Sequence, residues 1–219
     1  LKNRYKKASL PRIEIINLHS EILNKSSWIA NKTITKVNHY LDKGEQVLFF
    51  LNRRGFAPFI ICKKCGYKFQ CPNCAINLNF HKKLNQALCH YCGHKSSLLR
   101  NCENDKKCEL LFCGPGVERI FAELKKIYPN KKIEIFSSDT LKKNKSINIL
   151  LKKVESKKID ILVGTQLLSK GFHFPKLNCI VVVDGDFSSH GYDLRSAEKN
   201  IQLYHQLSGR AGREGNLST

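Results

Sequence analysis

The sequence has 219 residues and contains no methionine, a single tryptophan and only 18 acidic residues. No apolar run approaches the roughly 20 residues that a membrane-spanning helix needs, which argues against a membrane partner. The signal-peptide pattern of a basic start, an apolar core and a small-residue cleavage site is also missing, so we expect a cytoplasmic protein. The glycine-rich loop G-x-x-x-x-G-K-[ST] is absent, which excludes a complete triphosphate site of that type. Because the chain opens on Leu1 without an initiator, we expect a piece of a longer protein.

Positive charge dominates the composition. Lys and Arg number 38 against 18 Asp and Glu, which gives a formal net charge of +20. A surplus of this size favours a polyanionic partner, most often nucleic acid. Lysine outnumbers arginine, and Asn and Ile are abundant, as an AT-rich genome would produce. Part of the surplus therefore reflects base composition, and charge alone does not establish the partner.

Apolar periodicity divides most of the chain into alternating strands and helices. Apolar runs predict strands at residues 13–18, 46–52, 132–136, 159–164 and 179–184. Helical spacing predicts one helix that ends at Gly44, one at 117–128 that ends before Pro129, and others at 146–158 and 193–208. This alternation indicates an α/β fold with a parallel sheet covered on both faces.

Between residues 62 and 108 the periodicity is weak and cysteine dominates. This stretch holds eight of the ten cysteines, three pairs of which are C-x-x-C. A C-x-x-C turn supplies two corners of a tetrahedral zinc site. A disulfide framework would need an oxidising compartment, and nothing in the sequence indicates export. We therefore predict a zinc-binding insertion, with these ligands: Cys62, Cys65, Cys71, Cys74, Cys89, Cys92, Cys102 and Cys108.

The grouping of these ligands is open from spacing alone. A nested scheme joins the outer pairs around the inner ones, whereas a sequential scheme joins the first two pairs and the last two. The last pair is irregular: five residues separate Cys102 from Cys108, and Asp105 stands at the regular position as a possible substitute ligand for Cys108. Three histidines lie nearby and are expected to be solvated: His81, His90 and His94. The remaining cysteines, Cys113 and Cys179, are expected to be ordinary small apolar residues.

Three further segments, "FLNRRGF" (50–56), "GTQLLSKGFHFP" (164–175) and "QLSGRAGREG" (206–215), stand beside predicted strand or helix ends. Ligands gather at the carboxyl ends of strands in open α/β sheets, and arginines among glycines suit a phosphate. Each segment is a weak signal alone, but the three in this order are a strong one. Their candidate residues are Arg53, Arg54, Thr165, Gln166, Lys170, Gln206, Arg210 and Arg213.

In this order, the cysteine module and the three segments resemble the second, RecA-like lobe of the PriA family, the primosomal replication-restart DNA helicases of bacteria in superfamily 2. "FLNRRGFAP" is similar to motif IV of that family, "GTQLLSKGFHFP" to motif V, and "QLSGRAGR" to motif VI. The resemblance covers nearly the whole chain. It implies a helicase lobe formed by residues 1–61 and 109–219, interrupted by a zinc-binding insertion at 62–108. It also favours the nested scheme: Cys62, Cys65, Cys102 and Cys108 for one zinc, and Cys71, Cys74, Cys89 and Cys92 for a second.

The resemblance implies an ATP-dependent 3′→5′ helicase that binds single-stranded and forked DNA. Other primosomal proteins and single-strand-binding protein are the implied partners, and loading of the replicative helicase is the implied outcome. Arg210 and Arg213 would be arginine fingers, and Gln206 would couple DNA binding to the nucleotide. The implied DNA contacts are Arg53, Arg54, Thr165, Gln166 and Lys170.

ATP and Mg²⁺ would bind only together with a first lobe, so we expect this chain to be inactive as an ATPase by itself. The alternative hypothesis is a non-catalytic, zinc-dependent remnant that binds DNA or primosomal partners.

Overall fold

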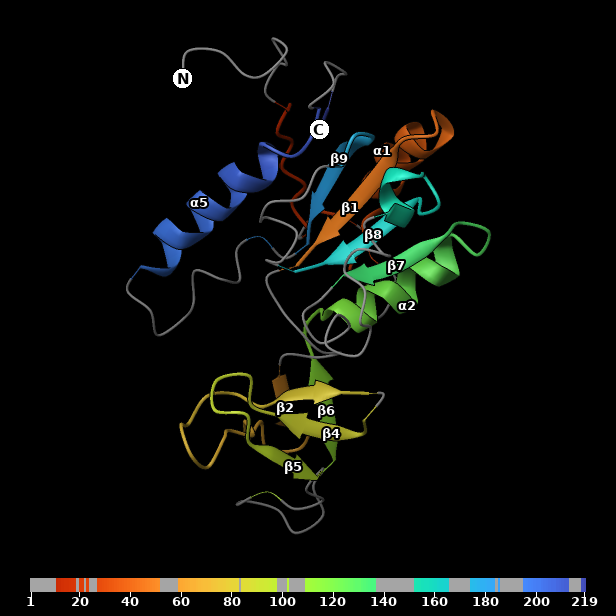
Figure 1. Cartoon of the computed structure of the whole chain (residues 1–219). Coiled ribbons are helices and arrows are strands. Elements are labelled where there is room, and N and C mark those ends of the chain that lie inside the picture. The colour runs from red at the N-terminus through yellow and green to blue at the C-terminus, as the bar shows by residue number, and fades with distance from the viewer. Residues whose placement is uncertain are drawn as a thin grey trace. The chain divides into compact units, whose positions relative to one another are not determined.

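The computed structural model describes residues 11–18, 20, 21, 23, 27–51, 59–82, 84–97, 102, 109–136, 152–165, 174–183, 185, 195–212 and 218–219. The chain forms two compact units (Figure 1). Unit 1 comprises Leu1–Asn52 and Glu123–Thr219, and unit 2 comprises Arg53–Ala122. The domain borders expected from the sequence, at residues 62 and 108, stay a prediction.

Unit 1 is built on a four-stranded parallel sheet. Its strands are β1 (Gln46–Phe50), β7 (Ile133–Phe136), β8 (Ile161–Gly164) and β9 (Leu177–Val182), in the order β7-β8-β1-β9. Leu48 of β1 is level with Leu162 of β8 on one side and with Ile180 of β9 on the other. All five residues of β1 are buried, as expected for a central strand covered on both faces.

Helices flank this sheet, which confirms the predicted α/β fold (Figure 1). They are α1 (Asn31–Asp42), α2 (Val117–Ile127), which crosses the border between the units, and α5 (Ser196–Ser208). Leu203 and Leu207 of α5 share a buried core with Phe50. Helix α1 ends at Asp42, just before the predicted stop at Gly44, whose φ of +68° is a left-handed conformation that glycine adopts without steric cost. In the described part of the chain, no helix has the length and apolarity to cross a bilayer.

Glu123 of α2 fixes the segment that leads into α1. Its carboxylate accepts a hydrogen bond from the Ser27 hydroxyl and from the backbone N–H groups of Trp28 and Ile29, the latter two at 3.1 and 3.2 Å. The residue that precedes α1, Ala30, has no side chain that caps the helix. The Glu123 carboxylate therefore satisfies backbone groups ahead of α1 that the local sequence leaves without acceptors.

The strands that the structure describes in unit 2 are short and antiparallel. One pair consists of β2 (Phe59–Cys62) and β6 (Leu110–Cys113), and a three-stranded sheet consists of β3 (Asn79–His81), β4 (Gln86–Leu88) and β5 (Lys95–Ser97). The Phe80 and Phe112 rings stack with centroids 4.0 Å apart and share a small core with buried cysteines. Strands of three or four residues bury little apolar surface, so this unit needs another source of stability.

One predicted element is not found in the structure, and another is described only in part. The strand predicted at 13–18 is wrong: residues 13–17 belong to no strand, and Ile13 and Ile15 are 80% and 88% exposed. Glu14 holds this segment instead through Lys36 at 2.9 Å and Lys32 at 3.4 Å, and hydrogen bonds from these ammonium groups lower the pKa of its carboxyl group. Of the helix predicted at 146–158, residues 152–155 are helical, and residues 146–151 lie outside the described part.

Replacing Glu123 with Ala should destabilise unit 1 by about 1 to 3 kcal/mol, because two backbone N–H groups and a hydroxyl lose a charged acceptor. Urea unfolding of the zinc-loaded chain measures the change. Glu155→Ala, at an exposed glutamate, is the matched control and should change the stability by less than about 0.5 kcal/mol. Equal stability of the Glu123 and Glu155 variants would show that the carboxylate is dispensable.

Candidate functional site

Three C-x-x-C turns in unit 2 share one backbone geometry. In each turn, the residue after the second cysteine donates its N–H to the carbonyl of the first: Gly66 to Cys62, Ala75 to Cys71, and Gly93 to Cys89, at 2.8, 2.8 and 3.0 Å. The N–H of the first cysteine in turn bonds the carbonyl five residues on, that of Tyr67, Ile76 or His94.

The closing residue of each turn has a positive φ: +74° at Gly66, +56° at Ala75 and +79° at Gly93. Glycine takes this conformation freely, whereas alanine pays roughly 1 kcal/mol for it. The turn at Cys71 therefore adopts the same shape as the other two against the local preference of its sequence. Each turn contributes both of its thiols to one cluster of sulfur atoms.

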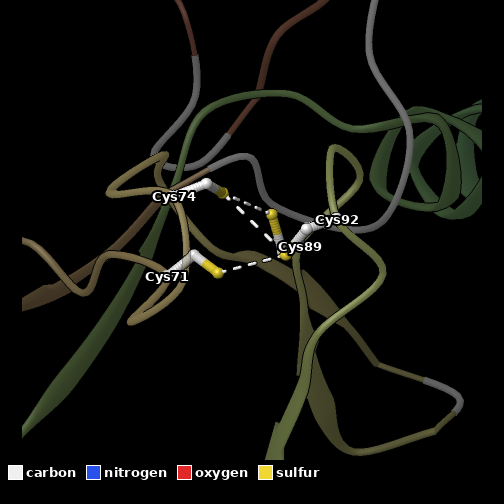
Figure 2. A group of neighbouring side chains, drawn as sticks. All are labelled: Cys71, Cys74, Cys89 and Cys92. Atoms are coloured by element: carbon white, nitrogen blue, oxygen red, sulfur yellow. Dashed lines mark hydrogen bonds between the residues drawn. The ribbon is translucent and has the colours of Figure 1, made fainter.

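The turns that begin at Cys71 and Cys89 together form a cluster of four sulfur atoms (Figure 2). Cys71 and Cys74 face Cys89 and Cys92, and all four Sγ atoms lie within 4.8 Å of one another. The Sγ atoms of Cys71 and Cys92 are 3.5 Å apart, and those of Cys74 and Cys89 are 3.4 Å apart. Zinc at about 2.3 Å from four tetrahedral sulfurs would set them about 3.8 Å apart. A disulfide would require about 2.05 Å, so the cluster has the geometry of a metal site.

A second cluster gathers Cys62, Cys65 and Cys102, again with Sγ atoms within 4.8 Å of one another. The Sγ atoms of Cys65 and Cys102 are 3.6 Å apart. Cys108 and Asp105, the two candidates for a fourth ligand, lie outside the described residues. The structure thus brings the described cysteines together in the nested order, with one cluster from the inner pairs and one from the outer.

Ionisation is unevenly distributed within the four-sulfur cluster. Burial opposes the thiolate of Cys89, but the backbone N–H groups of Cys92 and Tyr91 and the thiols of Cys74 and Cys92 lower its pKa to about 7. For Cys74, the N–H of Ile76 favours the thiolate, but desolvation and the neighbouring thiols together raise the pKa to about 12. Since a metal binds thiolates, a cation that enters the cluster must displace protons from it.

Two histidines beside the cluster behave differently from the expectation of solvated side chains. His81 is buried, at 6% exposure, and its Nε2 lies 3.0 Å from Nε2 of His90. His90 stands between the ligating positions 89 and 92, so this hydrogen bond ties the turn to strand β3. In the sequence, His81 follows a stretch at 76–80 in which apolar residues alternate with asparagine, and this pattern does not distinguish a buried from an exposed histidine.

The two cysteines expected to be ordinary small apolar residues are at least partly buried. Cys179 on β9 is buried, and burial raises the pKa of its thiol to about 12. Cys113 is half-buried on β6. All nine described cysteines are free thiols.

Two of the three helicase-like segments, 50–56 and 164–175, begin at one edge of the sheet in unit 1. Phe50, Phe136 and Gly164 end their strands level with one another. The Leu51 N–H bonds Gly164 at 2.9 Å, and the Val183 N–H bonds Phe50 at 2.9 Å. The strands β1, β7, β8 and β9 therefore end at the same carboxyl edge, which is the ligand-binding edge of open parallel sheets.

Of the predicted residues in these segments, the structure describes three. Thr165 is buried directly after β8, and its N–H contacts the carbonyl of Phe136 at 3.4 Å. Gln206 is exposed on α5, and Arg210 follows the end of that helix, where its N–H bonds Leu207. The remaining candidates lie outside the described residues: Arg53, Arg54, Gln166, Lys170 and Arg213.

Sequence reasoning missed a contact that joins two of these regions. The hydroxyl of Tyr204 on α5 donates to the carbonyl of Gly185, just beyond β9, at 2.6 Å. This bond holds α5, which leads into Arg210, next to the segment that follows β9. A tyrosine two residues before Gln206 was the available signal, but periodicity alone assigns it to the core.

Two families of known proteins match parts of this chain. Residues 92–215, more than half of the chain, match the helicase conserved C-terminal domain. The chain therefore belongs to the helicase C-terminal domain family. Residues 71–96 match the PriA DNA helicase Cys-rich region, which contains the four-sulfur cluster. Together with the cluster geometry, this identifies a helicase C-terminal lobe with a zinc-binding Cys-rich region.

Several relatives carry the name replication restart protein PriA. The one from Rickettsia conorii is 44% identical over 214 residues, which are 97% of this chain and 33% of that protein. The one from Bacillus subtilis is 36% identical over 97% of this chain and 27% of its own length. The one from Borreliella burgdorferi is 34% identical, with 97% and 31% covered. This chain thus spans about a third of the length of the curated relatives it matches.

Proposed function

We propose that this chain supplies the second motor lobe of a replication-restart DNA helicase of the PriA type. The supporting observation is the combination, in one chain, of the helicase C-terminal domain at 92–215 with the PriA Cys-rich region at 71–96. The proposed activity is ATP-dependent 3′→5′ movement on single-stranded and forked DNA, which assists loading of the replicative helicase. The proposed partners are other primosomal proteins and single-strand-binding protein, in the cytoplasm.

In this proposal Arg210 and Arg213 are arginine fingers. A guanidinium has fixed N–H donors and a permanent charge, so it can neutralise oxygens of a transferring phosphoryl group. The chain lacks a phosphate loop, so ATP and Mg²⁺ would be held by a first lobe that faces these arginines. Gln206, one turn before Arg210 on α5, would relay the state of the nucleotide to the DNA.

DNA would be contacted at the carboxyl edge of the sheet. Thr165 follows β8 there, and the segment with Arg53 and Arg54 follows β1 on the neighbouring strand. Gln166 and Lys170 continue from Thr165. These groups offer hydrogen bonds and charge to phosphates and few means to read bases, so we propose binding that depends weakly on sequence.

The Cys-rich region would hold two Zn²⁺ ions. The inner ion would be bound by Cys71, Cys74, Cys89 and Cys92. The outer ion would be bound by Cys62, Cys65, Cys102 and Cys108, with Asp105 as the possible substitute for Cys108. In both sites, zinc would cross-link turns that are distant in sequence and supply folding free energy to a unit with a small core.

Purified, reduced chain should carry two zinc ions, as measured by elemental analysis. Changing Cys71 and Cys74 together to Ala should remove one ion and loosen unit 2, because half of the inner ligands are lost. A metal content near zero in the unsubstituted chain would contradict the zinc proposal.

Two variants distinguish Cys108 from Asp105 as the fourth ligand of the outer zinc ion. Cys108→Ser should weaken retention of the second ion against a chelator, whereas Asp105→Asn should leave it unchanged. The reverse result would assign the ligand to Asp105. The visible spectrum of the Co²⁺-substituted chain distinguishes four thiolates from three thiolates and an oxygen.

Binding to single-stranded DNA should weaken steeply with salt, by about 0.7 log units in affinity per log unit of salt for each phosphate neutralised. Lys170→Ala should lower that slope by about 0.7, because one phosphate contact is lost. Lys43→Ala, at an exposed lysine outside the three motifs, serves as the control and should leave the slope unchanged. Titrations of fluorescent oligonucleotides at several salt concentrations measure both, and salt-independent binding would contradict the proposal.

ATP hydrolysis should be at background for the 219 residues alone, because an arginine finger without a phosphate loop has no phosphoryl group to stabilise. Joined to a first helicase lobe, the chain should support DNA-stimulated hydrolysis. Arg210→Lys and Arg213→Lys should each lower that rate by about 10³-fold or more, because a point charge does not replace the guanidinium fork. Arg12→Ala, at an exposed arginine outside the motifs, should keep the rate. Full activity with both fingers changed to Ala would rule out their role.

A further inference from the structure

We propose that Tyr91 is a stacking platform for an unpaired base of a single-stranded nucleic acid. The proposal rests on the proposed function for the identity of the strand, which is DNA. Tyr91 lies in the Cys89–Cys92 turn, and its side chain is 79% exposed. Every other tyrosine, phenylalanine or tryptophan in the described part of the chain is buried or half-buried.

The position of Tyr91 within its turn has no packing role. Lys64 and Asn73 occupy the equivalent place, directly before the second cysteine, in the two turns with the same backbone geometry. Both are exposed polar residues, as expected where a side chain points away from the sulfur cluster. An aromatic ring there is not needed for packing, and its exposed face is available for a base to stack on.

The turn that carries Tyr91 is fixed at several points. Its backbone is closed by the bonds from Gly93 to Cys89 at 3.0 Å and from Cys89 to His94 at 2.9 Å. His90, the preceding residue, bonds His81 at 3.0 Å. The thiols on either side join the four-sulfur cluster. A ring carried by a backbone that is fixed in this way loses little conformational entropy when a base stacks on it.

The charge around this unit favours a polyanion over an apolar protein surface. Five lysines of the described part of unit 2 are exposed: Lys63, Lys64, Lys68, Lys82 and Lys95. The exposed carboxylate described in the same unit, Glu109, is paired with Lys63 at 3.0 Å. The other exposed large apolar residues described in the unit are Leu84, between β3 and β4, and Leu111, on β6.

Stacking also suits a strand that passes close to the metal. A Zn²⁺ ion with four thiolates has a net charge of minus two, which offsets part of the attraction that nearby lysines exert on phosphates. The face of an aromatic ring attracts a base without charge, at any salt concentration. Tyr91 would therefore supply a salt-independent contribution at a place where the electrostatic one is weakened.

The test compares Tyr91→Ala, Tyr91→Leu and Tyr91→Phe with the unsubstituted zinc-loaded chain, after zinc content is shown to be equal. The probes are fluorescein-labelled (dT)20 and an abasic oligonucleotide of the same length, titrated by anisotropy at several salt concentrations. Leu84→Ala, which removes another exposed apolar side chain of unit 2, is the matched control. Tyr91→Leu keeps apolar surface but removes the ring face, and Tyr91→Phe keeps the ring.

We expect Tyr91→Ala and Tyr91→Leu to weaken (dT)20 binding by about 5- to 100-fold, and Tyr91→Phe and Leu84→Ala to stay within about twofold. The salt slope should be unchanged, and the abasic strand should bind equally to the unsubstituted chain and Tyr91→Ala. Equal (dT)20 binding by Tyr91→Ala, or an equal loss on the abasic strand, would overturn this inference while leaving the DNA-binding proposal intact. Failure of the unsubstituted chain to bind either oligonucleotide would overturn both.

Discussion

The hydrogen bonds that align the carboxyl ends of four parallel strands are the constraint on which the helicase-like half of the molecule depends. Leu51 is tied to Gly164, Val183 to Phe50, and Thr165 to Phe136. Segments more than a hundred residues apart in sequence consequently begin at one edge. The buried residues of β1 keep this register, because a shift would separate each closely packed side chain from its neighbours in the core. The placement of the motif residues therefore depends on β1, an apolar strand that contains none of the candidate site residues.

Unit 2 achieves order by other means. Its strands are three or four residues long, and its core is a cluster in which buried cysteines stand beside Phe69 and Phe80. The C-x-x-C turns repeat one hydrogen-bond pattern, even at Ala75, where the left-handed backbone is unfavourable. Such strain is maintained when the surroundings over-determine the conformation. Sulfur clusters that join turns from both ends of the unit provide that determination, because each cluster links residues far apart in sequence.

Local pattern predicted the strands of the sheet well, since continuous apolar runs such as that at 46–50 mark strands buried on both faces. It failed at 13–18, where an apolar alternation equally fits an exposed extended segment held by the ion pairs of Glu14. Cysteine spacing predicted a metal-binding region, but not which pairs meet, because that choice depends on how β2 and β6 bring the outer pairs together. The contacts of His81 and Tyr204 could not be predicted from the sequence either, since tertiary packing determines the partner of each side chain.

Metal binding changes how the net charge of the chain relates to DNA. The formal value of +20 counts every cysteine as neutral. Each site of four thiolates and one Zn²⁺ would subtract two charges within unit 2, where five exposed lysines are described. Bound zinc would thereby weaken the attraction of nearby lysines for phosphates. Base stacking is uncharged and is not reduced in this way, so an exposed aromatic ring beside the cluster would complement the lysines of unit 2 in holding a strand.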